Sequence, residues 1–375
     1  MALTITYAPV DLVGDHPLHV FYDNNVFKLS TDNPDAKLIS CEILSQPSNA
    51  VLAQQYSHVL DGNSVFNLRG VLSSLHSLYN NFITEPATLP TPGNIILVDT
   101  PKHSSGIKLR FSEFNTANEL VNPITTEYYR LLKAGVNEYE DRWGYNDTNK
   151  TMFGFAYPDS ATDLVTRYAF KNQLIPIVTI GPYVPDTMMQ LRLNGSNLGA
   201  EYDTHPTCYN LHLLRDGGSV TNNTLGMEYN EEQGMAILHH VQSTSLKFYT
   251  KPKPCRGGTL YFLNPWGGWE WFNYVDFVES TKVNKSDYEV YDEAFFGSKS
   301  HYKYISKDRT EKKLYSEYRD GKNTYYLKYL ITSPIVIDDL GNTVKVIDSS
   351  IRTNINELID PTVTIEYNTP NIINY

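Results

Sequence analysis

Residues Thr259–Phe277 read TLYFLNPWGGWEWFNYVDF and hold three of the four tryptophans of the chain. Pro265, followed by Gly267 and Gly268, interrupts any regular element, and glycine supplies the positive φ that a tight connection needs. After Gly268, both alternating sets of positions are largely apolar, as in a strand that is covered on both faces. The stretch therefore predicts a strand, a turn and a second strand that is buried on both sides.

This hairpin is the structural site around which we expect the C-terminal part of the chain to fold. A slip of one residue would exchange the two faces of its second strand, so the turn fixes the register. One interpretation places the tryptophans in the core of a β-sandwich, and the alternative exposes them as rings that stack on sugars. The residues of the site are Asn264, Pro265, Trp266, Gly267, Gly268, Trp269 and Trp271.

Composition narrows the classes of partner. The 375 residues carry a formal net charge of −11, which argues against a nucleic-acid groove, since phosphate binding relies on clustered Lys and Arg. The charged stretch Lys303–Lys313 mixes both signs and is typical of a solvated strand or loop. The sequence has no signal-peptide pattern and no apolar run of membrane-spanning length, so we expect a protein made in the cytoplasm and not inserted into a membrane.

Cysteine and tyrosine usage points to a structural protein without a metal or disulfide framework. The three cysteines, Cys41, Cys208 and Cys255, are far apart in sequence, and we expect them to be buried small hydrophobes. The 28 tyrosines favour β-sheets and protein interfaces, where a large amphipathic side chain has a low entropy cost. The composition thus favours β-structure and assembly.

Alternating apolar positions recur along most of the chain and predict a mainly β protein of tandem antiparallel β-sandwich domains with one or two short helices. An apolar stripe from Leu68 to Leu78 predicts one helix, and residues 160–170 a second. Residues 324–330 are expected to form a strand. The predicted domains are an N-terminal β-sandwich (1–137), a linker or projecting loop (138–173), a second β domain (174–257) and a C-terminal β domain with the Trp-rich hairpin (258–375).

Candidates for chemistry are weak. Glu201, Asp203 and His205 would share a strand face as metal ligands do, but the nearby glycine and proline predict a loop. His239 and His240 would point to opposite faces of a strand. Glu270 and Asp276 lie roughly 20 Å apart on an extended chain, which is too far to share one glycosidic bond. We predict no catalytic, cofactor-binding or metal-binding residues and no enzymatic activity.

Three stretches resemble virion proteins of tailed phages of Bacteroidetes, crAss-like phages among them. LTITYAP at Leu3–Pro9, with the elements at 16–20 and 65–78, looks like the opening domain of that family. YYRLLKAGV at Tyr128–Val136 is similar to its aromatic strand ending in Lys-Gly-Gly, with Ala134 in place of the first Gly. The most specific match is LYFLNPWGGW at Leu260–Trp269, where Trp266 replaces the commoner Leu, followed in order by the segments 330–336 and 346–350.

The resemblance implies a non-enzymatic structural component of the virion tail, as a hub, ring or baseplate protein. Its implied partners are other tail proteins and copies of itself in a ring, and its implied location is the virion. The alternative function is a β-sandwich adhesin module of the tail that binds a host-surface glycan. The resemblance carries over no catalytic residues.

Overall fold

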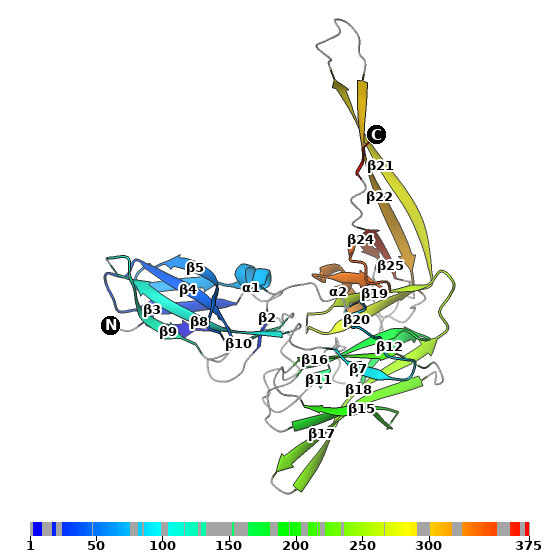
Figure 1. Ribbon diagram of the computed structural model, residues 1–375, viewed down its shortest axis with the longest axis horizontal. Helices are drawn as coiled ribbons and strands as arrows, with labels where there is room; N and C mark the ends of the chain where they lie inside the picture. Colours follow the sequence, from blue (N-terminus) through cyan, green and yellow to red (C-terminus); the bar gives the residue numbers. More distant parts are fainter. Residues whose placement is uncertain are drawn as a thin grey trace, which may run out of the picture. The chain divides into compact units, whose positions relative to one another are not determined.

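The computed structural model describes residues 3–9, 17–19, 25–46, 48–75, 82–84, 86–98, 104–115, 117–126, 129–132, 152–153, 164–180, 187–194, 196–203, 209–215, 217, 222–233, 236–265, 267–290, 301–316, 325–350, 361–367 and 372–374. These residues form six sheets, mostly antiparallel, and two short α-helices, which confirms the predicted mainly β class (Figure 1). The chain groups into two compact units. The first is Met1–Lys251 with Leu263–Glu270, and the second is Pro252–Phe262 with Trp271–Tyr375.

The N-terminal part of the first unit is a sandwich of two sheets with one helix. The smaller sheet has the order β1 (Leu3–Tyr7), β3 (Val26–Thr31) and β6 (Asn63–Asn67). The larger sheet has the order β2 (Pro17–His19), β10 (Tyr129–Leu132), β8 (Ser104–Phe114), β4 (Leu38–Ser45) and β5 (Val51–His58), with β9 (Leu120–Thr125) beside β8.

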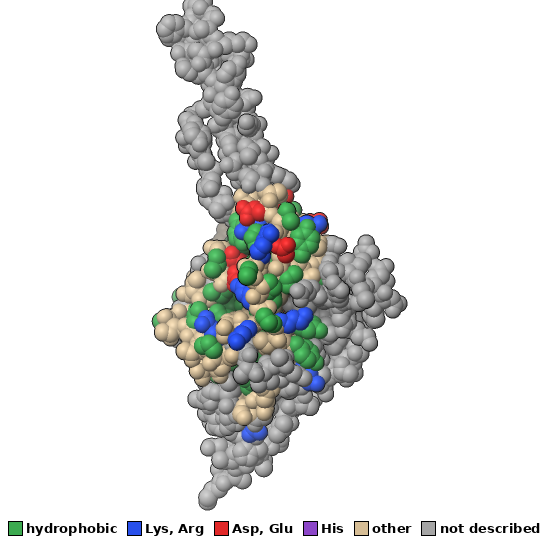
Figure 2. Space-filling model, turned by 90° about the vertical axis from the view of Figure 1, so that its right-hand side faces the viewer, with side chains coloured by type: hydrophobic (Ala, Val, Ile, Leu, Met, Phe, Trp, Pro, Cys, Tyr) green, Lys and Arg blue, Asp and Glu red, His purple; other side chains and the backbone are tan. Residues whose placement is uncertain are grey.

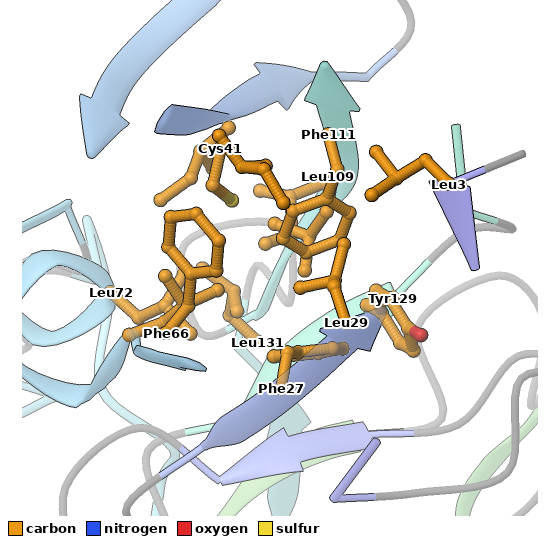
Figure 3. Packing of buried hydrophobic residues seen from close by; sticks show 14 residues of the cluster. Leu3, Phe27, Leu29, Cys41, Phe66, Leu72, Leu109, Phe111, Tyr129 and Leu131 are labelled. Atoms are coloured by element: carbon orange, nitrogen blue, oxygen red, sulfur yellow. The ribbon is translucent and has the colours of Figure 1, made fainter. Parts of the chain in front are cut away.

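Aromatic rings packed among aliphatic side chains fill the space between these two sheets (Figure 3). The ring of Phe111 lies 5.8 Å from that of Phe27 and 5.5 Å from that of Phe66, measured between centroids. Tyr129 meets Phe27 edge to face at 6.1 Å. The predicted first helix is confirmed as α1 (Arg69–Leu75), which buries Leu72 in this core, whereas Leu78 lies outside the described residues.

The rest of the first unit contains two further sheets. One has the order β11 (Met152–Phe153), β13 (Leu174–Ile180), β16 (Tyr209–Arg215) and β7 (Ile95–Leu97). The other has the order β12 (Leu164–Phe170), β18 (Ala236–Lys251), β17 (Asn222–Gln233), β14 (Thr187–Leu193) and β15 (Ser196–Asp203).

Two expectations for this region, a helix over 160–170 and a loop around Glu201, are wrong. The helix expected over 160–170 is strand β12, which pairs in parallel with β18, because pairing with a strand distant in sequence outweighs a weak local helix signal. The end of the expected linker, 138–173, is therefore part of a sheet, while its residues 138–151 and 154–163 lie outside the described residues. The loop expected around Glu201 and Asp203 is strand β15, and His205 lies outside the described residues.

The second unit holds most of two sheets. The smaller has the order β20 (Trp269–Tyr274), β19 (Gly258–Leu263) and β23 (Val336–Asp338), and the adjoining ends of β19 and β20, Leu263 and Trp269–Glu270, belong to the first unit. The larger has the order β21 (Asp276–Val290), β22 (His301–Tyr315), β25 (Thr362–Tyr367) and β24 (Val344–Ser350), with β26 (Ile372–Asn374) beside β22.

The strand expected over 324–330 is wrong. Those residues form the 3-10 turn η3 (Tyr325–Leu327) and helix α2 (Lys328–Thr332). The apolar residues Tyr326, Leu327 and Leu330 are buried, and a spacing of three to four residues puts side chains on one face of a helix rather than a strand. In the described part of the chain, no helix has the length and apolarity to span a membrane.

Candidate functional site

The turn of the aromatic hairpin is held by one residue, Asn264. Its backbone N–H donates to the Gly268 carbonyl at 2.8 Å, and its carbonyl accepts from the Gly267 N–H at 3.0 Å. Its side-chain oxygen accepts from the Gly268 N–H at 2.9 Å. Gly267 has φ +82°, a conformation that a side chain with a Cβ disfavours. The expected need for positive φ in this turn therefore falls on Gly267.

The tryptophans after the turn are buried. Trp269 is 1% exposed and Trp271 0%, and the other residues from Glu270 to Asn273 are buried too, so the expectation of a strand covered on both faces is confirmed. The ring of Phe82 meets Trp269 edge to face at 4.9 Å, and the Tyr326 hydroxyl donates to the Trp271 carbonyl at 3.1 Å. Trp269 and Trp271 are thus core residues and cannot stack on a sugar from solution. Trp266 lies outside the described residues.

A buried ion pair lies beside the turn. The Arg167 guanidinium on β12 donates two hydrogen bonds to the Glu270 carboxylate, at 2.7 Å from Nε to Oε2 and at 2.8 Å from Nη2 to Oε1. Both side chains are fully buried, and the Asn264 amide donates to the same carboxylate at 3.3 Å. A carboxylate can be held in such a site only when cations and donors replace its water. The pair joins β12 to the start of β20 within the first unit.

Sequence reasoning missed this pair. A glutamate between Trp269 and Trp271, on a strand expected to be buried on both sides, already implies a buried cation. Which cation it is depends on the parallel pairing of β12 with β18, and residues 160–170 were expected to form a helix. The two carboxylates considered for glycan cleavage lie in different environments, because Glu270 is buried and Asp276 is exposed.

Two buried polar groups away from this ion pair, His212 and Glu113, have lowered pKa values. His212 on β16 is 3% exposed, and burial lowers its pKa to about 3, so the imidazole is neutral in the folded protein. Burial alone would raise the pKa of Glu113 on β8, but hydrogen bonds from Thr31, Asn33 and Asn122 outweigh it and lower this pKa. The two amide groups each donate at 3.0 Å.

The described side chains provide no metal centre, because no group of three or more His, Cys, Asp or Glu lies together among them. Cys41 is buried, as expected, and its pKa is raised first by desolvation and then by Glu42. Cys255 is exposed, which corrects the expectation that it is buried; it follows Pro254 in the turn before β19, where no strand covers it. Cys208 lies outside the described residues.

The feature most suited to an interaction is the ribbon of β21 and β22. Each strand has 15 residues, and they pair in register from Asp276↔Tyr315 to Val290↔His301. Along β22, β25 pairs with Glu311–Tyr315 and β26 with Ile305–Lys307. The ribbon therefore runs beyond its sheet as an arm (Figure 1). We call Thr281–Val290 and His301–Thr310, the ten residues of each strand beyond β25, the distal arm.

Aromatic rings and cations hold the base of the arm. The Lys312 ammonium lies 5.1 Å from the ring centroid of Phe277 and 4.9 Å from that of Tyr367, and 3.4 Å from the Glu279 carboxylate. The Arg256 guanidinium also covers the Phe277 ring, at 4.8 Å. Cation–π contacts of this kind are worth about 0.5–1 kcal/mol each at exposed sites. Two cations therefore contact the Phe277 ring at the base of the arm.

The described residues of the face drawn in Figure 2 carry both acidic and basic side chains. Hydrophobic, basic and acidic side chains are interspersed among the described residues of this face (Figure 2). Elsewhere, on the outer face of the larger N-terminal sheet, Tyr56 is 50% exposed and its ring lies 5.9 Å from that of Phe114. The Arg110–Glu42 ion pair, at 2.6 Å, lies on neighbouring strands of the same sheet.

No protein-family model matches this sequence, and no curated protein matches it. Solved structures of tandem immunoglobulin domains are similar in part. Titin domains Z1Z2 in complex with telethonin are 11% identical, with 68% of this chain and 98% of that chain covered and a TM-score of 0.18. Tandem Ig repeats of Dlar are 10% identical, with 67% and 99% covered and a TM-score of 0.18. The Ig1-2 module of the Drosophila receptor protein tyrosine phosphatase DLAR is 12% identical, with 67% and 100% covered and a TM-score of 0.16.

TM-scores this low carry no argument about function. The β-sandwich character of the chain rests on its own sheets and on the core between them. The protein is thus built of tandem β-sandwich modules.

Proposed function

We propose that this protein is a non-enzymatic structural component of a phage virion tail, built in several copies as a hub, ring or baseplate element together with other tail proteins. The observation that carries the proposal is the arm formed by β21 and β22. An isolated two-stranded ribbon is marginally stable in water, the ten residues of each strand beyond β25 span about 33 Å, and there β26 pairs only with Ile305–Lys307. An arm of this length gains its stability from a partner.

The remaining support comes from the sequence. The segment Leu260–Trp269 and the order of the segments after it resemble tail proteins of Bacteroidetes phages. The structure gives this segment a strict geometry, because Asn264 and Gly267 fix the turn and the tryptophan side chains beyond it fill the core. The proposed location is accordingly the virion, after synthesis in the bacterial host cytoplasm.

The test is the protein content of purified particles. Mass spectrometry of gradient-purified virions should find the chain at a copy number above one per particle, and cryo-EM of the tail should show density for its sandwich domains. Detection only in infected-cell lysate, and not in particles, would refute the tail assignment.

A glycan-binding module of the tail is the second candidate, and Tyr56 is the observation that favours it. Its half-exposed ring, packed beside Phe114 on an open sheet face near the Arg110–Glu42 pair, offers a platform for a sugar ring with polar groups close by. Host-envelope glycans should bind the purified chain, and Tyr56→Ala should weaken binding at least tenfold while Tyr7→Ala, another exposed tyrosine on a different sheet, should not. Equal binding by both variants would exclude this platform.

A further inference from the structure

The outer edge of β21 is closed at its base and open beyond it. The Phe277 N–H donates to the Asp276 side chain at 2.8 Å, and the Phe277 carbonyl accepts from the Arg256 guanidinium. Arg256 and Asp276 pair with each other at 3.0 Å. Both backbone groups of Phe277 therefore point away from β22 and are capped by an ion pair.

The strand repeat extends this orientation along β21. Backbone groups alternate with period two, so those of Glu279 and of every second residue to Glu289 also point away from β22. Among the described residues, β21 pairs with β22 alone, and it forms one end of the strand order of its sheet. Val278, Glu279 and Ser280, the first residues beyond the cap, are exposed, Val278 by 55%.

We propose that the edge of β21 from Glu279 to Glu289 receives a strand from a second copy of this chain, and that the Arg256–Asp276 pair marks where this added strand ends. Edge strands in soluble proteins are commonly short or covered, because an open edge is a template for pairing. The cap covers the edge at Phe277, and among the described residues no strand pairs with the edge beyond it, as strand addition requires. This inference rests on the proposed function as a multi-copy component.

Size and charge favour another copy as the occupant. The distal arm has ten residues in each strand, and such a set of 20 matches the lower end of the about 20–30 residues that each partner contributes to a standard interface. It contains five Lys or Arg and three Asp or Glu, a net charge of +2, whereas the whole chain carries −11, so the remainder carries −13. The net positive charge lies on His301–Thr310 of β22, beside the receiving strand, and attracts the acidic remainder of a second copy.

The test uses proline at a position that faces the open edge. Val283 has the same parity as Phe277, so its N–H does not pair with β22, and proline is tolerated on edge strands at such positions. The full-length chain, Val283→Pro and the matched control Val283→Ala are compared by sedimentation velocity over a wide range of concentration, with thermal unfolding as a check on folding. The unmodified chain and Val283→Ala should assemble, and Val283→Pro should lose assembly while it keeps the melting temperature that the unmodified chain has as a monomer at low concentration.

Hydrogen exchange provides a second readout that needs no variant. Amides of odd-numbered residues from Glu279 to Glu289 should become protected when the unmodified chain assembles. Assembly of Val283→Pro like the control, equal exchange of these amides in monomer and assembly, or a monomer at every concentration would overturn the strand addition. None of these results bears on the tail assignment, which is refuted only by absence of the protein from particles.

Discussion

Arg167 and Glu270 are 103 positions apart in sequence and form two hydrogen bonds, at 2.7 and 2.8 Å, with both side chains fully buried. The pair ties β12 to the first residues of β20, next to the turn that Asn264 closes. A buried pair of this kind gives little net stability over apolar residues of similar size, but loss of one partner leaves a charge without its counter-ion.

Removal of one member of this pair should be costly. We expect Arg167→Met to lower the free energy of unfolding by about 3–5 kcal/mol, because Glu270 would remain buried without a cation. The double variant Arg167→Met with Glu270→Leu should recover most of that loss, as measured by urea unfolding in a double-mutant cycle. A single variant that costs under about 1 kcal/mol would mean that the carboxylate reaches water.

Glycine is required in the hairpin turn at one position. Gly267→Ala should cost about 1–2 kcal/mol, because its φ of +82° is disfavoured for any residue with a Cβ. Gly70→Ala is the control: it lies in helix α1, a Cβ there would meet nothing within 4 Å, and alanine should raise stability by up to about 1 kcal/mol. Thermal unfolding compares the two, and equal effects would show that the turn tolerates another backbone conformation.

Acid should destabilise the first unit through His212. Burial lowers its folded-state pKa to about 3, while the unfolded chain takes up the proton near pH 6.5. The contribution of neutral His212 to the free energy of unfolding should therefore be fully present above pH 6.5. It should fall by up to about 1.4 kcal/mol per pH unit as the pH decreases toward 3. His212→Gln should have a flatter dependence between pH 6.5 and 4.5 in urea unfolding, and identical slopes would show that the imidazole is solvated.

Glu113 should act in a lower pH window. Its folded-state pKa lies below the ordinary 4.5, because the hydrogen bonds from Thr31, Asn33 and Asn122 outweigh burial. Its contribution is present above pH 4.5 and should be lost as the pH falls below 4.5 toward the folded-state pKa. Glu113→Gln should lower stability at pH 7 by about 1–3 kcal/mol, since charge-assisted bonds are lost. Urea unfolding at pH 7 and pH 3.5 should show a smaller gap between variant and unmodified chain at the lower pH.

Several elements could be predicted because their signal is local. Residues Leu174–Ile180 form a short, nearly continuous apolar run and Thr362–Tyr367 alternate with the strand period, and both are strands. The stripe after Leu68 repeats every three to four residues and gives helix α1. The local signal was weak over 160–170 and 324–330, and there pairing with β18 and the burial of Tyr326 and Leu330 decided the structure.

The sequence alone determined the mainly β class, the position of the aromatic turn and the burial of the strand after it, since these depend on the order of residues within one segment. Only the tertiary structure decided that Glu270 pairs with Arg167, that Gly267 rather than Gly268 has positive φ, and that β21 and β22 continue past the rest of their sheet. A buried charge pairs with a residue that the fold brings close to it, and a strand pairs with the strands that the fold places beside it. These distances are fixed by packing and by backbone pairing between residues far apart in sequence.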